Sequence, residues 1–308
     1  MDRKSAQAPA AVIMIRPHHF SPNDQTAKDN AFQQSDQARS ALEIARDAYE
    51  EATLAAEKLE AKGVKVHIFE DKGVDTPDSV FPNNWFSTHA GGHIAIYPMF
   101  PENRRLERRY DVIEMLKKNY RVQDIIDYSG LEYDGLFLEG TGAMVLDHID
   151  RVAYAVKSNR TNPVALERFC THFNFEPMVF EALDEMGKPI YHTNVLMCIA
   201  TDFVMISLEM ITDKARRNEI VERFEGSGRE IIDLNRQQIA SFAGNALELQ
   251  GKAGRLLAIS SVALKALTSE QKSGIEKYVE ILPLSIPTVE LAGGSVRCML
   301  AGIHLLPR

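Results

Sequence analysis

The sequence is poor in features that mark several large classes of protein. Its 308 residues include only three cysteines, Cys170, Cys198 and Cys298. A disulfide framework is therefore not expected, and a reducing compartment, the cytoplasm, is favoured. No stretch approaches the ~18 consecutive apolar residues of a membrane span, so no membrane partner is expected. The short apolar run at 8–15 is interrupted by Arg16 and Pro17, and we expect a first strand there rather than a signal peptide.

Basic charge and metal-ligand clusters are scarce as well. The net charge is −8, whereas nucleic-acid binding needs clustered Lys and Arg, so no nucleic-acid partner is expected. The one basic cluster, at 104–109, is interleaved with glutamate, which is typical of a solvated helix face. The histidines lack the ligand set of a tetrahedral zinc site, so no metal is expected. Without linkers or low-complexity tracts, residues 1–308 are predicted to form one domain.

Hydrophobic periodicity alternates between helix and strand along the chain. The clearest helix is predicted from Ser35 to Lys62, with Ser35 or Asp36 as its cap and Gly63 ending it. A strand is predicted at 64–69. The same order recurs, with helices at 105–118, 163–172, 214–224 and 269–279 and strands at 122–126, 177–180, 230–234 and 282–289.

After each predicted strand, a segment of hairpin character carries a polar residue. These residues are Asn84, Glu139, His192, Asn245 and Cys298, at successive gaps of 55, 53, 53 and 53 residues. Self-similarity at a fixed period indicates a repeated supersecondary unit. Five such units suit a closed ring of α/β blades, which protects sheet edges and points equivalent positions at one central channel. A doubly wound sheet with accidental spacing is the alternative, and the nearly equal gaps favour the ring.

The residue types at these positions are those of nucleophilic catalysis. The Cys298 thiolate can attack when a partly exposed pocket supplies positive charge or dipoles. The His192 imidazole can transfer protons near neutral pH, and Glu139 can orient it or bind a cationic substrate head. Cys298 also follows Gly293 and Gly294, a turn that lets the backbone approach a ligand. Considered alone, the Glu139 segment is equally well a tight turn that ends a strand.

Around these positions the sequence resembles the guanidine-modifying (pentein) superfamily of arginine deiminases, dimethylarginine hydrolases and amidinotransferases. It is most similar to the citrulline-utilisation hydrolase branch. The resemblance spans nearly the whole chain and rests on the segments 30–33, 77–85, 103–105, 138–142, 158–162, 191–194 and 293–298. It implies a five-bladed α/β propeller with pseudo-fivefold ββαβ repeats around a central channel, and an amidinotransferase-type catalytic domain over residues 1–308 that needs no cofactor.

The resemblance also implies a role for individual residues. The implied catalytic set is Cys298 as nucleophile, His192 as general acid/base and Glu139 as partner of the substrate nitrogens. At the amino-acid end of the substrate, it implies Asp78 as ligand of the α-amino group. It further implies that Arg104 and Arg160 hold the α-carboxylate, a task that the bidentate guanidinium suits.

Two positions depart from the family pattern. Asn84 stands where hydrolases of arginine derivatives have an aspartate that grips the guanidinium, and Asn194 stands where arginine deiminases have an acidic residue. A guanidinium is a cation with donors only, whereas a ureido group is neutral and has an acceptor oxygen that an asparagine NH2 can serve. We therefore expect Asn84 and Asn194 to bind a ureido substrate such as citrulline.

The sequence thus predicts a cysteine hydrolase that cleaves a C–N bond of a ureido amino acid. The expected reaction converts citrulline to ornithine, ammonia and carbon dioxide through a covalent Cys298 thiocarbamoyl intermediate. The alternatives are an arginine- or methylarginine-type deiminase, an amidinotransferase, and a non-catalytic propeller used for binding. The small-molecule substrate is the expected partner. The order of the leaving groups, the role of Asn245 and the oligomeric state, a homo-oligomer included, are left open.

Overall fold

Five three-stranded sheets make up the architecture of this protein, for which a computed structural model describes residues 6–308. In each sheet the central strand pairs antiparallel with one neighbour and parallel with the other. The parallel pair is joined by a helical crossover, as parallel strands require. The repeat is therefore ββαβ, as predicted.

The sheets follow one another along the chain. The first contains β1 (Ala11–Pro17), helix α1 (Ala41–Ala61) and β2 (Lys65–Asp71). The others contain β3 (Phe86–His89), β4 (His93–Ile96), α2 (Tyr110–Asn119) and β5 (Asp124–Asp127); β6 (Met144–Asp147), β7 (Val152–Val156), α4 (Pro163–Phe173) and β8 (Glu176–Phe180); β9 (Met197–Ile199), β10 (Phe203–Ile206), α6 (Lys214–Gly226) and β11 (Glu230–Asp233); β12 (Leu247–Gln250), β13 (Arg255–Ser260), α8 (Ser261–Ala266), α9 (Ser269–Glu276) and β14 (Glu280–Leu284).

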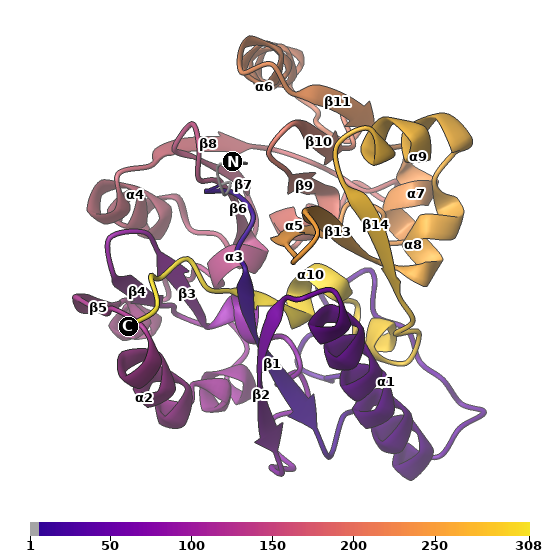
Figure 1. The fold of residues 1–308 in the computed structure, drawn as a ribbon. Helices are drawn as coiled ribbons and strands as arrows, with labels where there is room; N and C mark the ends of the chain where they lie inside the picture. The colour runs from indigo at the N-terminus through magenta and orange to yellow at the C-terminus, as the bar shows by residue number, and fades with distance from the viewer. Residues whose placement is uncertain (1–5) are drawn as a thin grey trace.

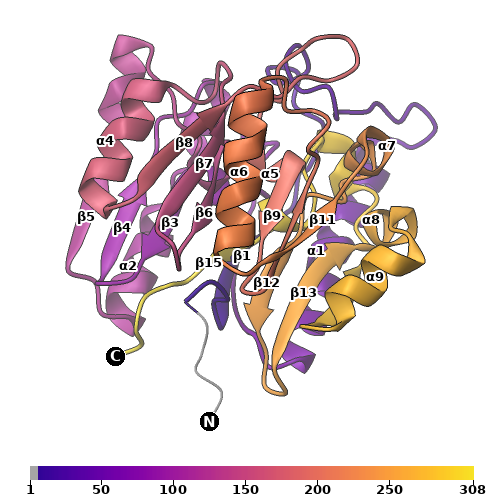
Figure 2. The ribbon, with the colours of Figure 1, turned by 90° about the horizontal axis from the view of Figure 1, so that it is seen from above.

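The sheets are arranged as a ring, with the long crossover helices outside and short helices within (Figure 1). The inner short helices are η1 (Pro82–Asn84), α3 (Gly140–Ala143), α5 (Thr193–Leu196) and α10 (Val296–Met299); the remaining ones are η2 (Asn103–Glu107), η3 (Ser129–Asp134), α7 (Arg236–Ala240) and η4 (Val289–Ala292). In the view from above, α4 and α6 run along the outer side of the strands (Figure 2). The last strand, β15 (Ala301–Gly302), pairs with β1 and so closes the ring.

Small side chains let the outer helices lie close to their sheets. The buried face of α1 carries Ala45, Ala48, Ala52, Ala55 and Ala56. Such a stripe at helical spacing brings the helix backbone near β1 and β2, and the apolar residues of this layer form one continuous cluster. Among residues 6–308, no helix is both long and apolar enough to cross a membrane.

The predicted start of the first helix is wrong. The helix begins at Ala41, and its cap is Ser40 rather than Ser35 or Asp36. The Ser40 hydroxyl accepts from the Glu43 N–H at 3.3 Å, while the Ser40 N–H donates to the Glu43 carboxylate at 2.8 Å. This reciprocal capping box fixes the boundary.

Two further predicted boundaries need correction. The helix predicted at 105–118 is divided into η2 and α2, with extended residues between them. The strand predicted at 282–289 is β14, which begins at Glu280 and already ends at Leu284. The other predicted helices and strands lie within a few residues of their observed bounds.

Candidate active site

The polar residues that recur in the sequence lie at the inner ends of the sheets. Asn84 ends η1, Glu139 caps α3, His192 caps α5 and Cys298 lies in α10, while Asn245 lies in the turn before β12. Each short segment directly precedes the first strand of an antiparallel pair. Helices α3, α5 and α10 lie at the centre of the ring (Figure 1), and contacts there link Glu139 to His192, Asn245 to Cys298, and Asn84 and His192 to Gly142.

Two glycines of α3 allow this convergence. Gly140 has φ +49°, and a Cβ there would meet the Asn83 carbonyl oxygen at 2.5 Å. A Cβ on Gly142 would lie 2.1 Å from the Asn84 amide and 2.9 Å from the His192 ring. Because glycine has no side chain, α3 can pack directly against η1 and α5, and no larger residue would fit at these two positions.

The Cys298 sulfur is held by two side-chain amides. Its side chain is 2% exposed, more deeply buried than the partly exposed pocket that the sequence suggested. Asn194 Nδ2 donates to Sγ at 3.2 Å, and Asn245 Nδ2 donates to it at 3.3 Å. Two neutral amide donors therefore contact the sulfur directly and hold it in position.

The orientation of the Asn245 amide is fixed by the backbone. Its Oδ1 accepts from the Arg297 N–H at 3.0 Å, and a backbone N–H can only donate. Nδ2 must therefore face the other way, where it donates to the Asn194 carbonyl oxygen at 2.9 Å and to Cys298 Sγ. The sequence left Asn245 without a role, and the structure shows it as a fixed donor to the sulfur.

His192 and Glu139 form a buried pair. The imidazole Nε2 lies 2.7 Å from Glu139 Oε2, and Glu139 Oε1 accepts from the Phe100 N–H at 2.9 Å. Burial raises the pKa of Glu139, but the Arg160 charge and the His192 hydrogen bond outweigh it and lower the pKa to about 2. Burial lowers the pKa of His192 to about 4, and Glu139 offsets this only partly. At neutral pH the imidazole is therefore uncharged and can accept a proton.

Arg104 is buried and has a carboxylate partner of its own. Its Nε and Nη2 donate to the two Glu107 carboxylate oxygens at 2.9 and 2.8 Å. Burial disfavours the charged guanidinium, but Glu107, Asp78 and Glu139 together outweigh burial and raise the pKa of Arg104 above its ordinary value. With its amide oxygen toward Arg104, Asn84 accepts at 2.9 and 3.1 Å, and its Nδ2 donates to Asn83 Oδ1 at 3.2 Å. One hydrogen of the Asn84 NH2 then remains for a substrate oxygen.

Arg160 is likewise paired across the site. Its Nη2 and Nε donate to the Asp29 carboxylate at 2.6 and 2.9 Å, and its Nη1 lies 3.5 Å from Glu139 Oε2. The guanidinium stacks on the Tyr191 ring at 4.9 Å. The Tyr191 hydroxyl in turn donates to the Gly293 carbonyl oxygen at 2.6 Å, so Tyr191 links Arg160 to the segment that leads to the cysteine. A substrate carboxylate at Arg160 would have to share or displace Asp29.

Two acceptors of the site have no hydrogen-bond donor among the described residues. They are Asp78 Oδ1 and Asn194 Oδ1, and both side chains are buried. The other Asp78 oxygen accepts from Asn23 at 2.9 Å, and burial raises the pKa of Asp78. Buried acceptors are rarely left unpaired, so two such atoms near one sulfur point to donors on a ligand.

A small cavity joins most of the predicted site residues: Asp78, Asn84, Arg104, Arg160, His192 and Cys298. Glu139 and Asn194 are buried behind this wall, against His192 and Cys298. The cavity of about 10 Å³ holds roughly one water molecule. Side chains or loops must therefore move apart before an amino acid fits.

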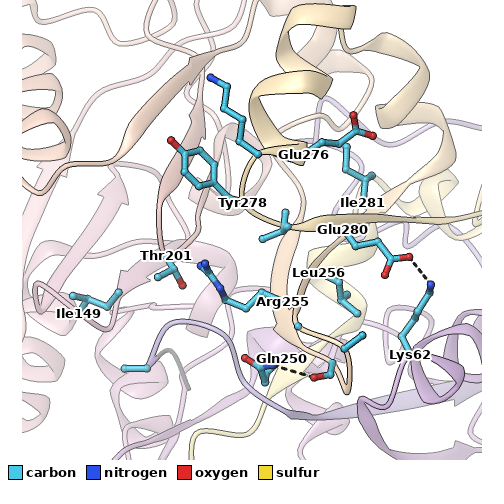
Figure 3. Close-up of a pocket in the computed structure, with 16 residues that line it drawn as sticks. Lys62, Ile149, Thr201, Gln250, Arg255, Leu256, Glu276, Tyr278, Glu280 and Ile281 are labelled. Atoms are coloured by element: carbon cyan, nitrogen blue, oxygen red, sulfur yellow. Dashed lines mark hydrogen bonds and ion pairs between the residues drawn. The ribbon is translucent and has the colours of Figure 1, made fainter. Parts of the chain in front are cut away.

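A wider cavity of about 770 Å³ lies beside β12, β13 and β14 (Figure 3). Its lining carries charges of both signs, with Lys62 paired to Glu280. Arg255, also in its wall, pairs with Asp202 at 2.6 Å and with Glu248 at 2.9 Å. None of the predicted site residues lines it, so cavity size alone does not identify the site.

Sequence reasoning missed Asn23, Asp29, Glu107 and Tyr191. Glu107 had a readable signal, because a residue three positions after Arg104 on a helical turn can pair with it. Asp29 had none, since it meets Arg160 across 131 residues.

Among the described residues, no group of three or more His, Cys, Asp or Glu side chains could hold a metal ion.

Comparison with known proteins places this geometry in a family. The model of the eukaryotic N,N-dimethylarginine dimethylhydrolase family matches residues 16–305. No curated protein matches the chain. A substrate-bound mutant of the N-terminal domain of ArgZ, an arginine dihydrolase from the ornithine-ammonia cycle in Cyanobacteria, is 15% identical with a TM-score of 0.72. That comparison covers 95% of this chain and 97% of that chain.

Two other solved structures are similar. A mutant of AgrE in complex with L-arginine is 16% identical with a TM-score of 0.74, covering 95% of this chain and 40% of that chain. A dimethylarginine dimethylaminohydrolase adduct with S-methyl-L-thiocitrulline is 12% identical with a TM-score of 0.60, covering 97% and 99%. At these identities the structures show a shared fold, which confirms the predicted pentein architecture. Because the family model spans nearly the whole chain, the protein belongs to the N,N-dimethylarginine dimethylhydrolase family of the guanidine-modifying (pentein) superfamily, and it is a hydrolase of non-peptide C–N bonds.

Proposed function

We propose that the protein hydrolyses the ureido group of citrulline, yielding ornithine, ammonia and carbon dioxide, with Cys298 as nucleophile. The observation that carries this proposal is the pair of neutral amides, Asn194 and Asn245, on the Cys298 sulfur. Asn84 adds a third amide in the wall of the same cavity. A neutral ureido head suits amides that donate and accept, whereas a guanidinium favours carboxylates.

His192 begins the reaction as a base. Its imidazole is uncharged at neutral pH because its pKa is about 4, so it can take the proton of the Cys298 thiol. The thiolate, held by the two amide donors, attacks the ureido carbon. The protonated imidazole, stabilised by Glu139, then gives its proton to the departing nitrogen, and that C–N bond breaks.

A thiocarbamoyl enzyme remains after the first nitrogen leaves. His192, neutral again, takes a proton from water, and the resulting hydroxide attacks the thiocarbamoyl carbon. The C–S bond breaks and the sulfur regains its proton. The carbamate released loses carbon dioxide and frees the second amine, so one water is consumed overall. The proposal holds whichever nitrogen leaves first.

The charged residues around the cavity suit the amino-acid end of the substrate. Asp78 Oδ1 is a buried acceptor without a donor among the described residues, and an α-ammonium group would supply one. We assign the α-carboxylate to Arg104 and Arg160, where it would replace part of the Asp29 contact. We assign Asn194 Oδ1, the second acceptor without a donor among the described residues, to an N–H of the ureido head.

Arginine is the second candidate substrate. ArgZ is an arginine dihydrolase, and the structure of its N-terminal domain is similar to 95% of this chain. An arginine dihydrolase would repeat the same thiol chemistry on the guanidinium and then on the ureido group. It would release two ammonia molecules for each ornithine, whereas citrulline hydrolysis releases one.

We also propose that the enzyme works in the reducing cytoplasm, because Cys298 must stay reduced and free of a disulfide to act as nucleophile.

The purified full-length chain, incubated separately with citrulline, arginine and a methylarginine, separates these functions. Ornithine, citrulline and ammonia are measured, with Cys298→Ala as control. The proposal predicts ornithine and ammonia in equal amounts from citrulline and none from the control. Citrulline accumulating from arginine, with no turnover of citrulline, would show a deiminase instead. Activity unchanged in Cys298→Ala would refute the proposed mechanism.

A further inference from the structure

Arg297 points away from the site that its neighbour Cys298 serves. Successive residues of a helix are turned by 100°, so two adjacent side chains of α10 face different directions. Cys298 lines the cavity of the candidate active site. Arg297 instead lines two other small cavities.

These two cavities lie along the central channel. Both are lined by the same five residues, Leu146, His148, Leu247, Arg297 and His304. The rest of their walls comes largely from the strands β3, β9 and β15 and from Pro9 and Gln7. Cavities of about 20 and 30 Å³ each hold roughly one water molecule or one ion of similar size.

The Arg297 guanidinium has no carboxylate within ion-pair distance among residues 6–308. Its one hydrogen bond there is from Nη1 to the Leu300 carbonyl oxygen at 2.9 Å, and a guanidinium has five N–H donors. The carboxylates nearest in sequence to His148, Asp147 and Asp150, are paired with Arg229 at 2.8 and 2.6 Å. A partly buried guanidinium that makes one hydrogen bond to the described residues keeps four N–H donors for a negatively charged partner in these cavities.

Two imidazoles, those of His148 and His304, line the same cavities as the Arg297 guanidinium. The rings of His148 and His304 stack at 3.9 Å between centroids. Burial, together with the Arg297 charge, lowers the pKa of His304 to about 4 and that of His148 well below its ordinary value. The groups that act on His148 are His304, His89, Arg151 and Arg297, and none of them is acidic. The neutral His148 ring has one N–H to donate, whereas His304 already makes a hydrogen bond to the Ala6 backbone.

From this arrangement we propose that Arg297, His148 and His304 form a binding site for a small inorganic anion of chloride size in the central channel. The volumes of the two cavities match an ion of that size. The same residue connects this site to the catalytic region, because the Arg297 N–H holds the Asn245 amide that donates to Cys298. Anion binding is therefore expected to stabilise α10 and the residues around the nucleophile.

Bromide is the probe, because its anomalous scattering locates it in a crystal. The account predicts a bromide peak beside Arg297 in wild-type crystals soaked in sodium bromide, and no peak there in Arg297→Met. In solution, the thermal unfolding midpoint of the wild type should rise by about 2 °C in bromide over gluconate of equal ionic strength. Arg46→Met, a change at a surface arginine whose side chain is 63% exposed, should keep that rise, and Arg297→Met should lose it.

Several outcomes would overturn the proposal. Bromide found only at Arg104, Arg160 or the outer surface would do so, as would an equal rise in midpoint in Arg297→Met. A crystal peak without any solution effect in the wild type would show an adventitious ion only. Should Arg297→Met fail to fold, the wild type decides alone: bromide beside Arg297 together with the rise in midpoint supports the site, and the absence of either refutes it.

Discussion

At the scale of single residues, the surroundings of Cys298 are built from neutral donors. The nearest polar atoms on its sulfur are the Nδ2 groups of Asn194 and Asn245, while the charges of Glu139, Arg104 and Arg160 are matched among themselves and with Asp29 and Glu107. A thiolate in such a setting depends on amide donors held in the right orientation. The orientation of Asn245 comes from a backbone N–H and is therefore rigid.

Asn245→Asp tests this dependence with almost no change of shape. The new carboxylate still accepts from the Arg297 N–H, but it presents an oxygen instead of an N–H to the sulfur. Alkylation by iodoacetamide at neutral pH should slow by roughly 10-fold or more, and its pH profile should move to higher pH. Asn235→Asp, at the cap of α7, is the matched control and should alkylate like the wild type. An unchanged profile for Asn245→Asp would remove Asn245 from the account.

Asn84→Asp tests the choice of a ureido over a guanidino head. The carboxylate keeps the acceptor for Arg104, and the buried Asn83 Nδ2, which has no partner among the described residues, can turn to donate to it. The added charge should raise the ratio of kcat/KM for arginine to that for citrulline by about 10-fold or more, chiefly by lowering turnover of citrulline. A ratio that stays the same or falls would show that Asn84 does not select the substrate.

Stability should depend on pH through His192. Its folded pKa of about 4 lies below the unfolded value of about 6.5, so the unfolded chain binds more protons between these values. The contribution of neutral His192 to the free energy of unfolding is complete above pH 6.5 and is lost as the pH falls toward 4. Glu139, with a folded pKa of about 2, loses its contribution only between about pH 4.5 and 2. Both changes destabilise the protein in acid.

Denaturant unfolding between pH 7 and 4 measures this dependence. Glu107 and Glu290, whose pKa values burial raises to about 7, act in the opposite direction in both proteins, so the two slopes are compared. As the pH is lowered, the free energy of unfolding should fall less steeply in His192→Asn than in the wild type, because the variant lacks the His192 contribution. His89, His148 and His304 also have lowered pKa values and act in the same direction, so some slope should remain. An equal or steeper slope in His192→Asn would contradict the lowered pKa of His192.

Much of the site could be predicted from residue types and their spacing. The 53-residue register alone selected Glu139, His192 and Cys298, because equivalent positions of a repeat face one axis. Asp29 could not be found, since no local pattern predicts that a loop residue will meet Arg160 across the ring. The role of Asn245 depends on a backbone N–H of a distant residue, which residue types do not encode.

At the scale of elements, short helices and their caps determine where the functional side chains lie. The periodicity of the first long helix was readable, but its start was not, because Ser35, Asp36 and Ser40 are all acceptable caps by type. Only Ser40 has a Glu three residues later, and that capping box forms. The signal was therefore present in the sequence, but the prediction placed the cap at Ser35 or Asp36 instead.

Ser40→Ala should therefore lower the free energy of unfolding by about 1 kcal/mol. Ser35→Ala, at the cap predicted first, should change it by less than about 0.5 kcal/mol. Turnover should be unchanged in both, since α1 lies outside the ring and contributes no residue to the cavity. Equal losses in the two variants would contradict the observed boundary.

At the scale of the whole molecule, the closed ring turns a repeated sequence into one site. The chain begins the first sheet with β1 and completes it with β15, which follows Cys298 closely. Closure therefore places Cys298 among residues from all the other blades. The number and order of blades followed from the period, whereas the small size of the cavity depends on loop and side-chain packing that the period does not determine. That residues 1–308 form one catalytic domain stays a prediction.

Intact-mass analysis of rapidly quenched reactions tests the central claim most directly. The wild-type chain is mixed with citrulline, quenched at short times and compared with Cys298→Ala. The account predicts a transient carbamoyl-type adduct on Cys298 that rises before ornithine appears and is absent from the variant. Ornithine formed at full rate with no adduct at any time, or formed equally by Cys298→Ala, would contradict it.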